Sequence, residues 1–252
     1  MTGILHGDVA VITGCSRGIG AAIAEAFARE GANLVLMGRD KGRLEAVADA
    51  LRAAYGTRTE IVTGAIADSL TSAHALEAAD RLGGATILVN NAGIFPAAAI
   101  GDTTDAMFED VMGSNFTGTF NTCRALIPGM VARGKGSVVN ISSIAARVPT
   151  PSLSIYAASK GAVEAFSRAL AAEVAPVVRV NCVSPGPILT EVAMEMAAND
   201  TTGAVNEVES GIPLARRGTP EEVAEAVLFL ASSRGSWTTG QVLQVNGGGL
   251  MT

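Results

Sequence analysis

The chain contains few cysteines and few histidines, and this scarcity bears on metal and disulfide chemistry. Its 252 residues include three cysteines and two histidines. Cys15, Cys123 and Cys182 do not have the spacing of a metal site, and their odd number does not suit a disulfide framework. Two histidines offer little material for a histidine-based metal centre. We therefore predict no metal site and three reduced thiols, as is usual in a cytoplasmic protein.

Charge and long apolar runs are also scarce. Charged residues make up 17% of the chain, the net charge is −6, and no run of basic residues is present, whereas a nucleic-acid-binding protein needs a basic face. No stretch reaches the roughly 18 apolar residues that cross a bilayer. Asp8 interrupts the N-terminal region, and the apolar run after it is too short for a signal peptide. We expect a cytoplasmic protein with no nucleic-acid or membrane partner.

Apolar residues, by contrast, are plentiful at 48%, and they fall in short β-rich runs that alternate with helical stretches. Strands that are apolar on both faces and alternate with helices are typical of a parallel sheet between two helical layers. The sequence predicts a single-domain, Rossmann-type doubly wound parallel α/β fold of about seven strands. The strands are predicted at residues 9–13, 34–37, 61–62, 87–89, 137–141, 177–183 and 242–245. Helices are predicted up to about residue 29 and at 41–54, 71–82, 111–132 and 154–174.

One segment, at about residues 190–218, differs from this pattern. It contains methionines, is polar at its centre and closes with Pro213. Such a segment between well-patterned strands is compatible with a lid over a substrate site and with a plain surface excursion. We interpret it as a substrate lid.

A glycine-rich turn joins the first predicted strand to the first helix. Glycines allow tight turning and close approach of a phosphate to the backbone, and the helix N-terminus supplies free N–H groups. The three residues between its first two glycines depart from the commoner G-x-G-x-x-G spacing, and such a turn can also be purely structural. Its position in the first strand–helix unit favours a dinucleotide. The predicted cofactor-binding residues of this turn are Gly14, Ser16, Arg17, Gly18, Ile19 and Gly20.

Tyr156 and Lys160 are four residues apart in a predicted alanine-rich helix, so their side chains share one face. A phenol with a pKa of about 10 is a poor acid or base at neutral pH. A neighbouring ammonium favours the phenolate and lowers that pKa. Taken alone, the pair favours two side chains that merely share an exposed helix face. Ser142 and Ser143 follow the strand at 137–141, at the edge where open α/β sheets bind ligands.

Together, these motifs resemble the short-chain dehydrogenase/reductase family. The resemblance rests on the glycine spacing, on Asn90-Asn91-Ala92-Gly93 after the fourth strand and on Tyr156-x-x-x-Lys160, and it extends from Asp8 to Gly248. It implies hydride transfer between a nicotinamide and a carbonyl or secondary alcohol, with Tyr156 as acid and base. Metal chemistry is not implied.

The resemblance also implies roles for the other candidate catalytic residues. Ser143, 13 residues before Tyr156, corresponds to the reacting serine that polarises the carbonyl, with Ser142 as the alternative. Lys160 would lower the tyrosine pKa and hold the ribose hydroxyls. Asn115, in Gly113-Ser114-Asn115-Phe116, would hold a water of a proton relay; its residue type is also compatible with bending or capping a helix.

The second strand indicates the preferred cofactor. An NAD-dependent enzyme usually has a carboxylate at its end for the ribose hydroxyls, but this chain has Gly38 there, followed by Arg39. Arg39 and Arg17 suit a 2′-phosphate, so we predict that NADP(H) is preferred over NAD(H). Asp40 is the competing signal, because it could turn back toward the ribose.

By resemblance, further residues complete the cofactor site. Ala65 occupies the position of the family's adenine-binding aspartate, which leaves Ile66 and the backbone for that contact. The predicted residues lining the cofactor cleft and the nicotinamide side are Asn91, Ala92, Gly93, Tyr156, Lys160, Pro185, Gly186, Ile188 and Thr190.

Substrate and assembly are less constrained. Val192, Met194 and Met196 indicate an apolar, adaptable pocket, with residues 94–96 on the opposite wall. The general resemblance is to 3-oxoacyl-thioester reductases and ketoreductases. Ala172 stands where enzymes acting on carrier proteins have a basic residue, so a small ketone or polyol is equally admissible. The resemblance implies a homotetramer through two long helices and the C-terminal strand. The alternatives are a redox sensor without turnover, an NAD-preferring polyol or alcohol dehydrogenase, and an epimerase or dehydratase, which is usually a longer chain.

Overall fold

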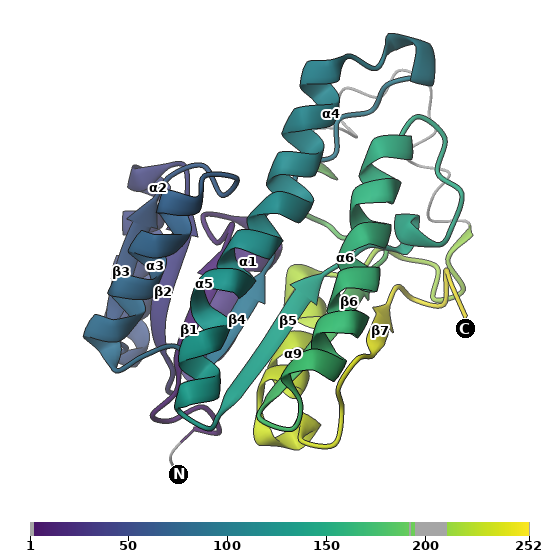
Figure 1. Cartoon of the computed structure of the whole chain (residues 1–252). Coiled ribbons are helices and arrows are strands. Elements are labelled where there is room, and N and C mark those ends of the chain that lie inside the picture. The colour runs from purple at the N-terminus through teal and green to yellow at the C-terminus, as the bar shows by residue number, and fades with distance from the viewer. Residues whose placement is uncertain (1–2, 192, 195–210, 252) are drawn as a thin grey trace.

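Seven parallel strands form one sheet in the computed structural model, which describes residues 3–191, 193–194 and 211–251. The spatial order is β3-β2-β1-β4-β5-β6-β7, and every neighbouring pair is parallel. The strands are β1 (Val9–Thr13), β2 (Asn33–Gly38), β3 (Thr59–Thr63), β4 (Ile87–Asn90), β5 (Gly136–Ile141), β6 (Val178–Pro185) and β7 (Val242–Val245) (Figure 1).

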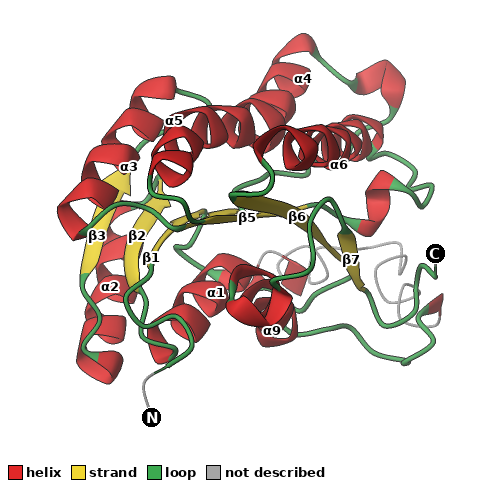
Figure 2. Cartoon of the chain, turned by 60° about the horizontal axis from the view of Figure 1, so that its bottom comes forward, coloured by secondary structure: helices red, strands yellow, loops and turns green. Residues whose placement is uncertain are grey.

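Helices cover both faces of this sheet, as Figure 2 shows. One layer contains α1 (Gly18–Arg29), α2 (Lys41–Tyr55) and α9 (Pro220–Ala231). The other contains α3 (Ser69–Leu82), α4 (Asp105–Met112), α5 (Gly118–Ala132) and α6 (Ser154–Val174). The predicted doubly wound α/β fold is therefore confirmed, with strand positions within a few residues of those expected.

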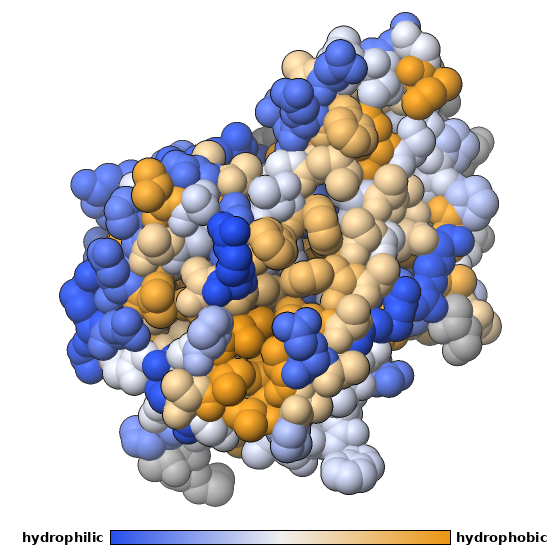
Figure 3. Space-filling view, in the orientation of Figure 1, coloured by the Kyte–Doolittle hydropathy of each residue, from blue (hydrophilic) through white to orange (hydrophobic). Residues whose placement is uncertain are grey.

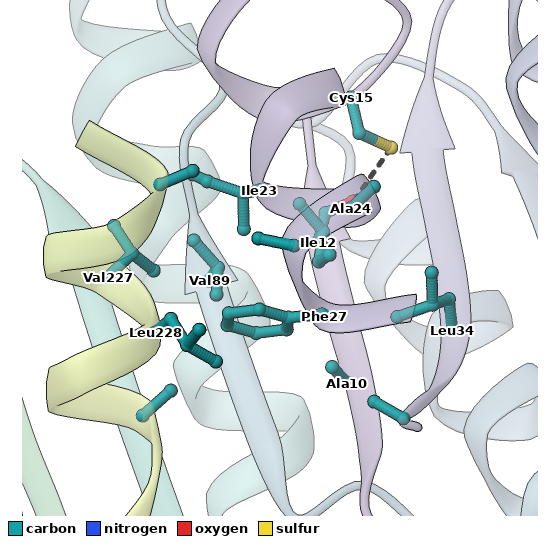
Figure 4. Close-up of a cluster of buried hydrophobic side chains, with 14 of the residues drawn as sticks. Ala10, Ile12, Cys15, Ile23, Ala24, Phe27, Leu34, Val89, Val227 and Leu228 are labelled. Carbon is teal, nitrogen blue, oxygen red and sulfur yellow. Dashed lines mark hydrogen bonds between the residues drawn. The ribbon is translucent and has the colours of Figure 1, made fainter. Parts of the chain in front are cut away.

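Two apolar cores, one on each face, explain why the strands are apolar throughout. Successive side chains of a strand point to opposite faces. Ile12 of β1 packs with Phe27 of α1 and Val227 of α9, as Figure 4 shows (Figure 4). Its neighbour Val11 belongs to the second core, with Leu126 of α5 and other buried residues. A polar substitution on either face of a central strand would therefore enter a core.

Two helical regions differ from the sequence-based expectation. The helix predicted at 111–132 begins at Asp105 and is interrupted by a π-helical turn, Gly113–Thr117, between α4 and α5. Helix α9 was not predicted, although Thr219 and Glu222 form a capping box and Pro220 occupies the first turn. The ion pair of Glu222 with Arg216 further supports this helix start.

The strand order reverses direction at β1, whose neighbours β2 and β4 are reached by crossovers on opposite faces. Ligands of open α/β sheets bind at such a switch point, beside the carboxyl ends of the strands. The predicted lid at about 190–218 lies mostly outside the described residues, which include its ends. Gly218, at the end of this segment, pairs with Ile188, just before its start, as an isolated parallel bridge. Within the described ranges, none of the helices combines the length and apolarity that a membrane crossing requires.

Candidate active site

The ends of β1 and β4 are tied together at the carboxyl edge. The Oγ1 of Thr13 accepts hydrogen bonds from the backbone N–H groups of Asn91 and Ala92, each at 3.0 Å. The side-chain amide of Asn91 donates to the carbonyl oxygens of Thr13 and Gly14, at 3.1 and 2.9 Å. These bonds hold Asn91 and Ala92 against the glycine-rich turn. Thr13 was not predicted as a site residue, although it directly precedes Gly14 where β1 ends.

The glycine-rich turn is closely packed and needs glycine at two of its positions. Gly14 has a positive φ of 67°, which favours glycine. A Cβ on Gly20 would lie 2.2 Å from the carbonyl oxygen of Gly14. Helix α1 begins here, and the side chain of its N-cap residue, Arg17, makes no capping hydrogen bond to the first N–H groups. This cradle fits the pyrophosphate of a dinucleotide.

At the end of β2, the structure shows what Asp40 and the nearby arginines contact. Asp40 is the N-cap of α2, where its carboxylate accepts from the backbone N–H of Arg43 at 3.0 Å. It is therefore engaged in helix capping. Arg39 is exposed, and Arg17 and Arg43 lie 3.8 and 3.5 Å from the carboxylate of Glu191. Arg43, which the sequence analysis did not single out, adds a guanidinium to this corner.

The loop after β3 carries no carboxylate aimed at an adenine. Ala65 is exposed, and Asp68 is the N-cap of α3, accepting from the N–H of Leu70 at 2.9 Å. Ile66 packs against Gly118, where a Cβ would lie 2.7 Å from the Ile66 side chain. Ile66 is thus held in place at the start of α5.

Tyr156 and Lys160 lie on one face of α6, directed at the end of β5. The Lys160 Nζ is 5.8 Å from the centre of the Tyr156 ring and donates to the carbonyl oxygen of Ile141 at 2.8 Å. Ser143 is the N-cap of the 3₁₀ turn Ile144–Ala146, and its hydroxyl is hydrogen-bonded to the Tyr156 side chain. The structure thus brings together three of the four predicted catalytic side chains, and its contacts favour Ser143 over Ser142 as the partner of Tyr156.

Burial governs the protonation of this pair. It raises the pKa of Tyr156, while the hydrogen bond from Ser143 works in the opposite direction. Burial also lowers the pKa of Lys160 from 10.5 to about 8. The expectation that the tyrosine pKa is lowered differs from this result, because removal from water disfavours the phenolate. The phenol therefore remains protonated at neutral pH, as a proton donor requires.

Asn115, the fourth predicted catalytic residue, lies buried in the π-helical turn between α4 and α5. Its Oδ1 accepts from the N–H of Ile94 at 2.8 Å, and its Nδ2 donates to the Ile94 carbonyl and to the Ser159 Oγ, each at 2.9 Å. A Cβ on Gly93 would lie 3.1 Å from Asn115 Oδ1 and 3.4 Å from Lys160 Nζ. Asn115 therefore combines a helix irregularity, a feature common at functional sites, with a place beside Lys160.

Ser159 was also missed by the sequence analysis. It stands between Tyr156 and Lys160 in the chain, and its hydroxyl donates to the Tyr156 carbonyl at 2.7 Å while accepting from Asn115. Nothing in the sequence pattern distinguishes Ser159 from a serine on the surface of a helix. It connects α6 to the π-helical turn.

The loop after β6 completes the cleft. The N–H of Gly186 donates to the Val245 carbonyl at 3.0 Å, and the N–H of Leu189 donates to Gly218 at 2.9 Å. The methyl group of Thr190 lies 3.4 Å from the point that a Cβ on Gly18 would occupy. Thr190 thus lies beside the glycine-rich turn, and the nicotinamide-side role of residues 185–190 stays a prediction. Met194 is exposed, whereas Val192 and Met196 lie outside the described residues.

A metal centre has no counterpart in the described ranges, where no three His, Cys, Asp or Glu side chains gather in a group able to hold an ion. The three cysteines are free and buried, and burial raises the pKa of Cys15 to about 12. These thiols are therefore poor nucleophiles.

Taken together, the fold and the glycine cradle define a dinucleotide-binding α/β protein, and sequence comparison narrows the class. The family profile described as Enoyl-(Acyl carrier protein) reductase matches residues 14–249. The 3-oxoacyl-(acyl-carrier-protein) reductase FabG of Chlamydia trachomatis serovar D is 37% identical over 250 residues, which cover 98% of this chain and 99% of the relative.

Solved structures agree. A short chain dehydrogenase/reductase family protein has a TM-score of 0.87 at 41% identity, with 99% of both chains covered. L-Sorbose reductase from Gluconobacter frateurii, complexed with NADPH and L-sorbose, has a TM-score of 0.92 at 37% identity, with 100% of this chain and 99% of that chain covered. The chain belongs to the short-chain dehydrogenase/reductase family and is an oxidoreductase acting on carbonyl or alcohol groups.

Burial of Lys160 predicts a specific pH dependence of stability. Between about pH 8 and 10.5, the unfolded chain keeps a proton on this lysine that the folded chain has lost, so stability rises with pH; below about pH 8 the full penalty of burying the ammonium applies. Relative to Lys160→Met, we expect the wild-type free energy of unfolding to increase across this range by up to about 3 kcal/mol. Urea unfolding of both proteins at several pH values measures the difference. Lys41→Met, which removes an exposed lysine, should give no such trend. If the difference in unfolding free energy between wild type and Lys160→Met stays constant with pH, the lowered pKa of Lys160 is contradicted.

Proposed function

We propose that this protein is an NADP(H)-dependent reductase of ketones or 3-oxoacyl thioesters, equally able to oxidise the matching secondary alcohols. The observation that carries the proposal is the convergence of Tyr156, Ser143, Lys160 and Asn115 at the carboxyl edge, beside the glycine cradle. A redox sensor needs the cradle but has no use for a proton donor with its pKa raised by burial.

The chemistry divides between cofactor and side chains. A bound nicotinamide supplies or accepts the hydride. Tyr156 donates its proton to the carbonyl oxygen, and its raised pKa keeps that proton available at neutral pH. Ser143 donates a hydrogen bond to the same oxygen as negative charge develops. Lys160, with a pKa of about 8, is mostly an ammonium at neutral pH and stabilises the phenolate left after transfer.

Asn115 has a positioning role in this scheme. Its side-chain amide is fully engaged with Ile94 and Ser159, so it holds the π-helical turn against α6. The main-chain carbonyl oxygen of Asn115 accepts from the Thr119 hydroxyl at 3.0 Å. Through these contacts the Asn115 side chain stays close to Lys160. A proton relay to solvent would begin at Lys160.

The preference for NADP(H) rests on charge at the end of β2. Arg39 and Arg43 follow Gly38, and Arg17 lies close to Arg43, near the same Glu191 carboxylate. Asp40 is engaged as a helix cap and pairs with Arg43. Guanidiniums bind a 2′-phosphate through charge-assisted hydrogen bonds. The L-sorbose reductase relative, whose structure contains NADPH, supports the same preference.

Two substrate classes fit the relatives, whose names specify 3-oxoacyl groups in one case and a ketose in another. The Phe95 ring lies beside the Tyr156 ring, with centres 5.8 Å apart, so one wall of the site is aromatic. This wall supports binding of the apolar part of a ketone or thioester, and it leaves both classes to be compared by experiment.

We also propose a homotetramer. Figure 3 shows apolar surface along the face formed by α5 and α6 (Figure 3). Phe120 and Val131 of α5 are exposed there, and the Phe166 ring of α6 lies edge-on to Phe120, with ring centres 6.3 Å apart. Phe166 is half-buried, and exposed apolar side chains such as Phe120 and Val131 on one helix face are typical of an interface between subunits.

Turnover tests the catalytic assignment. With NADPH and a panel of ketones, β-ketoesters and 3-oxoacyl thioesters, we expect loss of reduced-nicotinamide absorbance. Tyr156→Phe should lower kcat by at least about 10²-fold, because the proton donor is gone, while NADPH affinity stays within about twofold. Tight NADPH binding without turnover on any ketone, thioester, alcohol or polyol would instead favour a sensor.

Cofactor binding tests the arginine assignment. Arg39→Leu should raise the Kd of NADPH by about tenfold or more and leave that of NADH nearly unchanged, because a charge-assisted hydrogen bond contributes about 1.5–3 kcal/mol. Arg234→Leu is the matched control, since Arg234 is exposed and precedes β7, at the opposite edge of the sheet. Titration by nicotinamide fluorescence measures both affinities. Equal weakening of NADPH and NADH would refute the preference.

Sedimentation equilibrium tests the assembly. We expect a mass four times that of the chain, and a smaller mass for Phe120→Glu, which places a charge on the apolar face of α5. Leu70→Glu is the control, because Leu70 is an exposed apolar residue of α3. A monomeric wild type would contradict the tetramer.

A further inference from the structure

Helix α6 carries a buried carboxylate that the proposed chemistry does not use. Glu164 lies one turn beyond Lys160, and its side chain is only 5% exposed. Burial of an unpaired carboxylate is strongly unfavourable, so such groups are retained with partners. Glu164 has two well-placed ones. Its Oε1 accepts from the Ser142 hydroxyl at 2.9 Å, and its Oε2 accepts from the Arg147 Nε at 3.0 Å.

These two partners stand on either side of Ser143. Ser142 directly precedes it, and Arg147 follows the 3₁₀ turn Ile144–Ala146 that Ser143 caps. Lys160 holds the residue before this segment by donating to the Ile141 carbonyl. Consecutive turns of α6 therefore grip the segment at three points, two before Ser143 and one after it.

Ser143 is buried, and its carbonyl oxygen accepts from the Ala146 N–H at 3.0 Å, within the same segment. Its hydroxyl accepts from the Ala145 N–H at 3.2 Å and is hydrogen-bonded to Tyr156, and both contacts depend on where the segment lies. A catalytic hydrogen bond requires placement within about 0.5 Å, which usually depends on surrounding side chains that lock the loop. The two-ended attachment through Glu164 meets that need, because charge-assisted hydrogen bonds in a buried site are strong.

We propose that Glu164 is a positioning residue for Ser143: by bridging Ser142 and Arg147, it fixes the segment that presents the Ser143 hydroxyl to the substrate oxygen. The proposal rests on the proposed function for the role of Ser143. Arg168, whose Nη1 is 3.8 Å from the same carboxylate and exposed, adds to the pairing without touching the segment. A competing explanation is that the ion pair only stabilises the fold.

A double-mutant cycle separates the two explanations. Glu164→Gln preserves side-chain volume but removes the charge that Arg147 faces. We expect kcat to fall about tenfold while the Kd of NADPH changes less than about twofold. In a Ser143→Ala background, the same change should lower kcat less than about twofold further, because the group it positions is absent. Equal effects in both backgrounds would overturn the proposal.

Two further variants provide controls. Ser142→Ala removes one attachment but keeps the ion pair of Glu164 with Arg147, and it should lower kcat in the same way but by less. It keeps the test intact if Glu164→Gln folds poorly. Glu60 lies on β3 and forms an ion pair with Arg81. Glu60→Gln removes this carboxylate and should leave kcat unchanged.

Hydrogen exchange gives a readout that does not depend on turnover. Glu164→Gln should increase amide exchange at residues 142–147 and leave β5 and α6 protected, whereas Glu60→Gln should leave this segment unchanged. Unaltered exchange at 142–147 would overturn the proposal even in an active enzyme. If the wild type turned over no substrate, faster exchange there would still support the attachment, while the proposed function would fail separately.

Discussion

Parallel pairing of all seven strands is the constraint on which the rest of the structure depends. Parallel strands need crossover helices, and those helices bury both faces of the sheet, so every strand must be apolar on both sides. The same pairing places all carboxyl ends at one edge. Loops after β1, β2, β4, β5 and β6 therefore meet there, and each brings a different part of the site.

Buried polar groups give that edge its fixed geometry. The Asn90 side chain of β4 donates to Asn140 of β5 at 2.9 Å, and Asn140 donates to Ser167 of α6 at 2.7 Å. The Thr122 hydroxyl of α5 donates to Asn90 at 2.6 Å. This network joins the elements that carry Ser143, Tyr156 and the end of the π-helical turn. Each member is satisfied, which makes such a network rigid rather than merely costly.

Burial also determines the charge states in the site. It lowers the pKa of Lys160 to about 8 and raises that of Tyr156, which leaves a protonated phenol beside a lysine whose pKa lies below its usual value. Glu164, one turn further along α6, remains compatible with burial because Arg147 and Ser142 satisfy both of its oxygens.

Local patterns in the sequence by themselves determined the alternation of strands and helices, the phosphate-binding turn and the pairing of Tyr156 with Lys160, because hydrophobic periodicity and helical spacing act over a few residues. The start of α9 is also specified by a local pattern, the capping box at Thr219. Only the tertiary structure decided that the predicted helix at 111–132 contains a π-helical turn at Asn115, that burial raises the pKa of Tyr156, and that Glu164 reaches Ser142 and Arg147. These outcomes depend on contacts between residues far apart in the chain and on exclusion of water, neither of which a local pattern specifies.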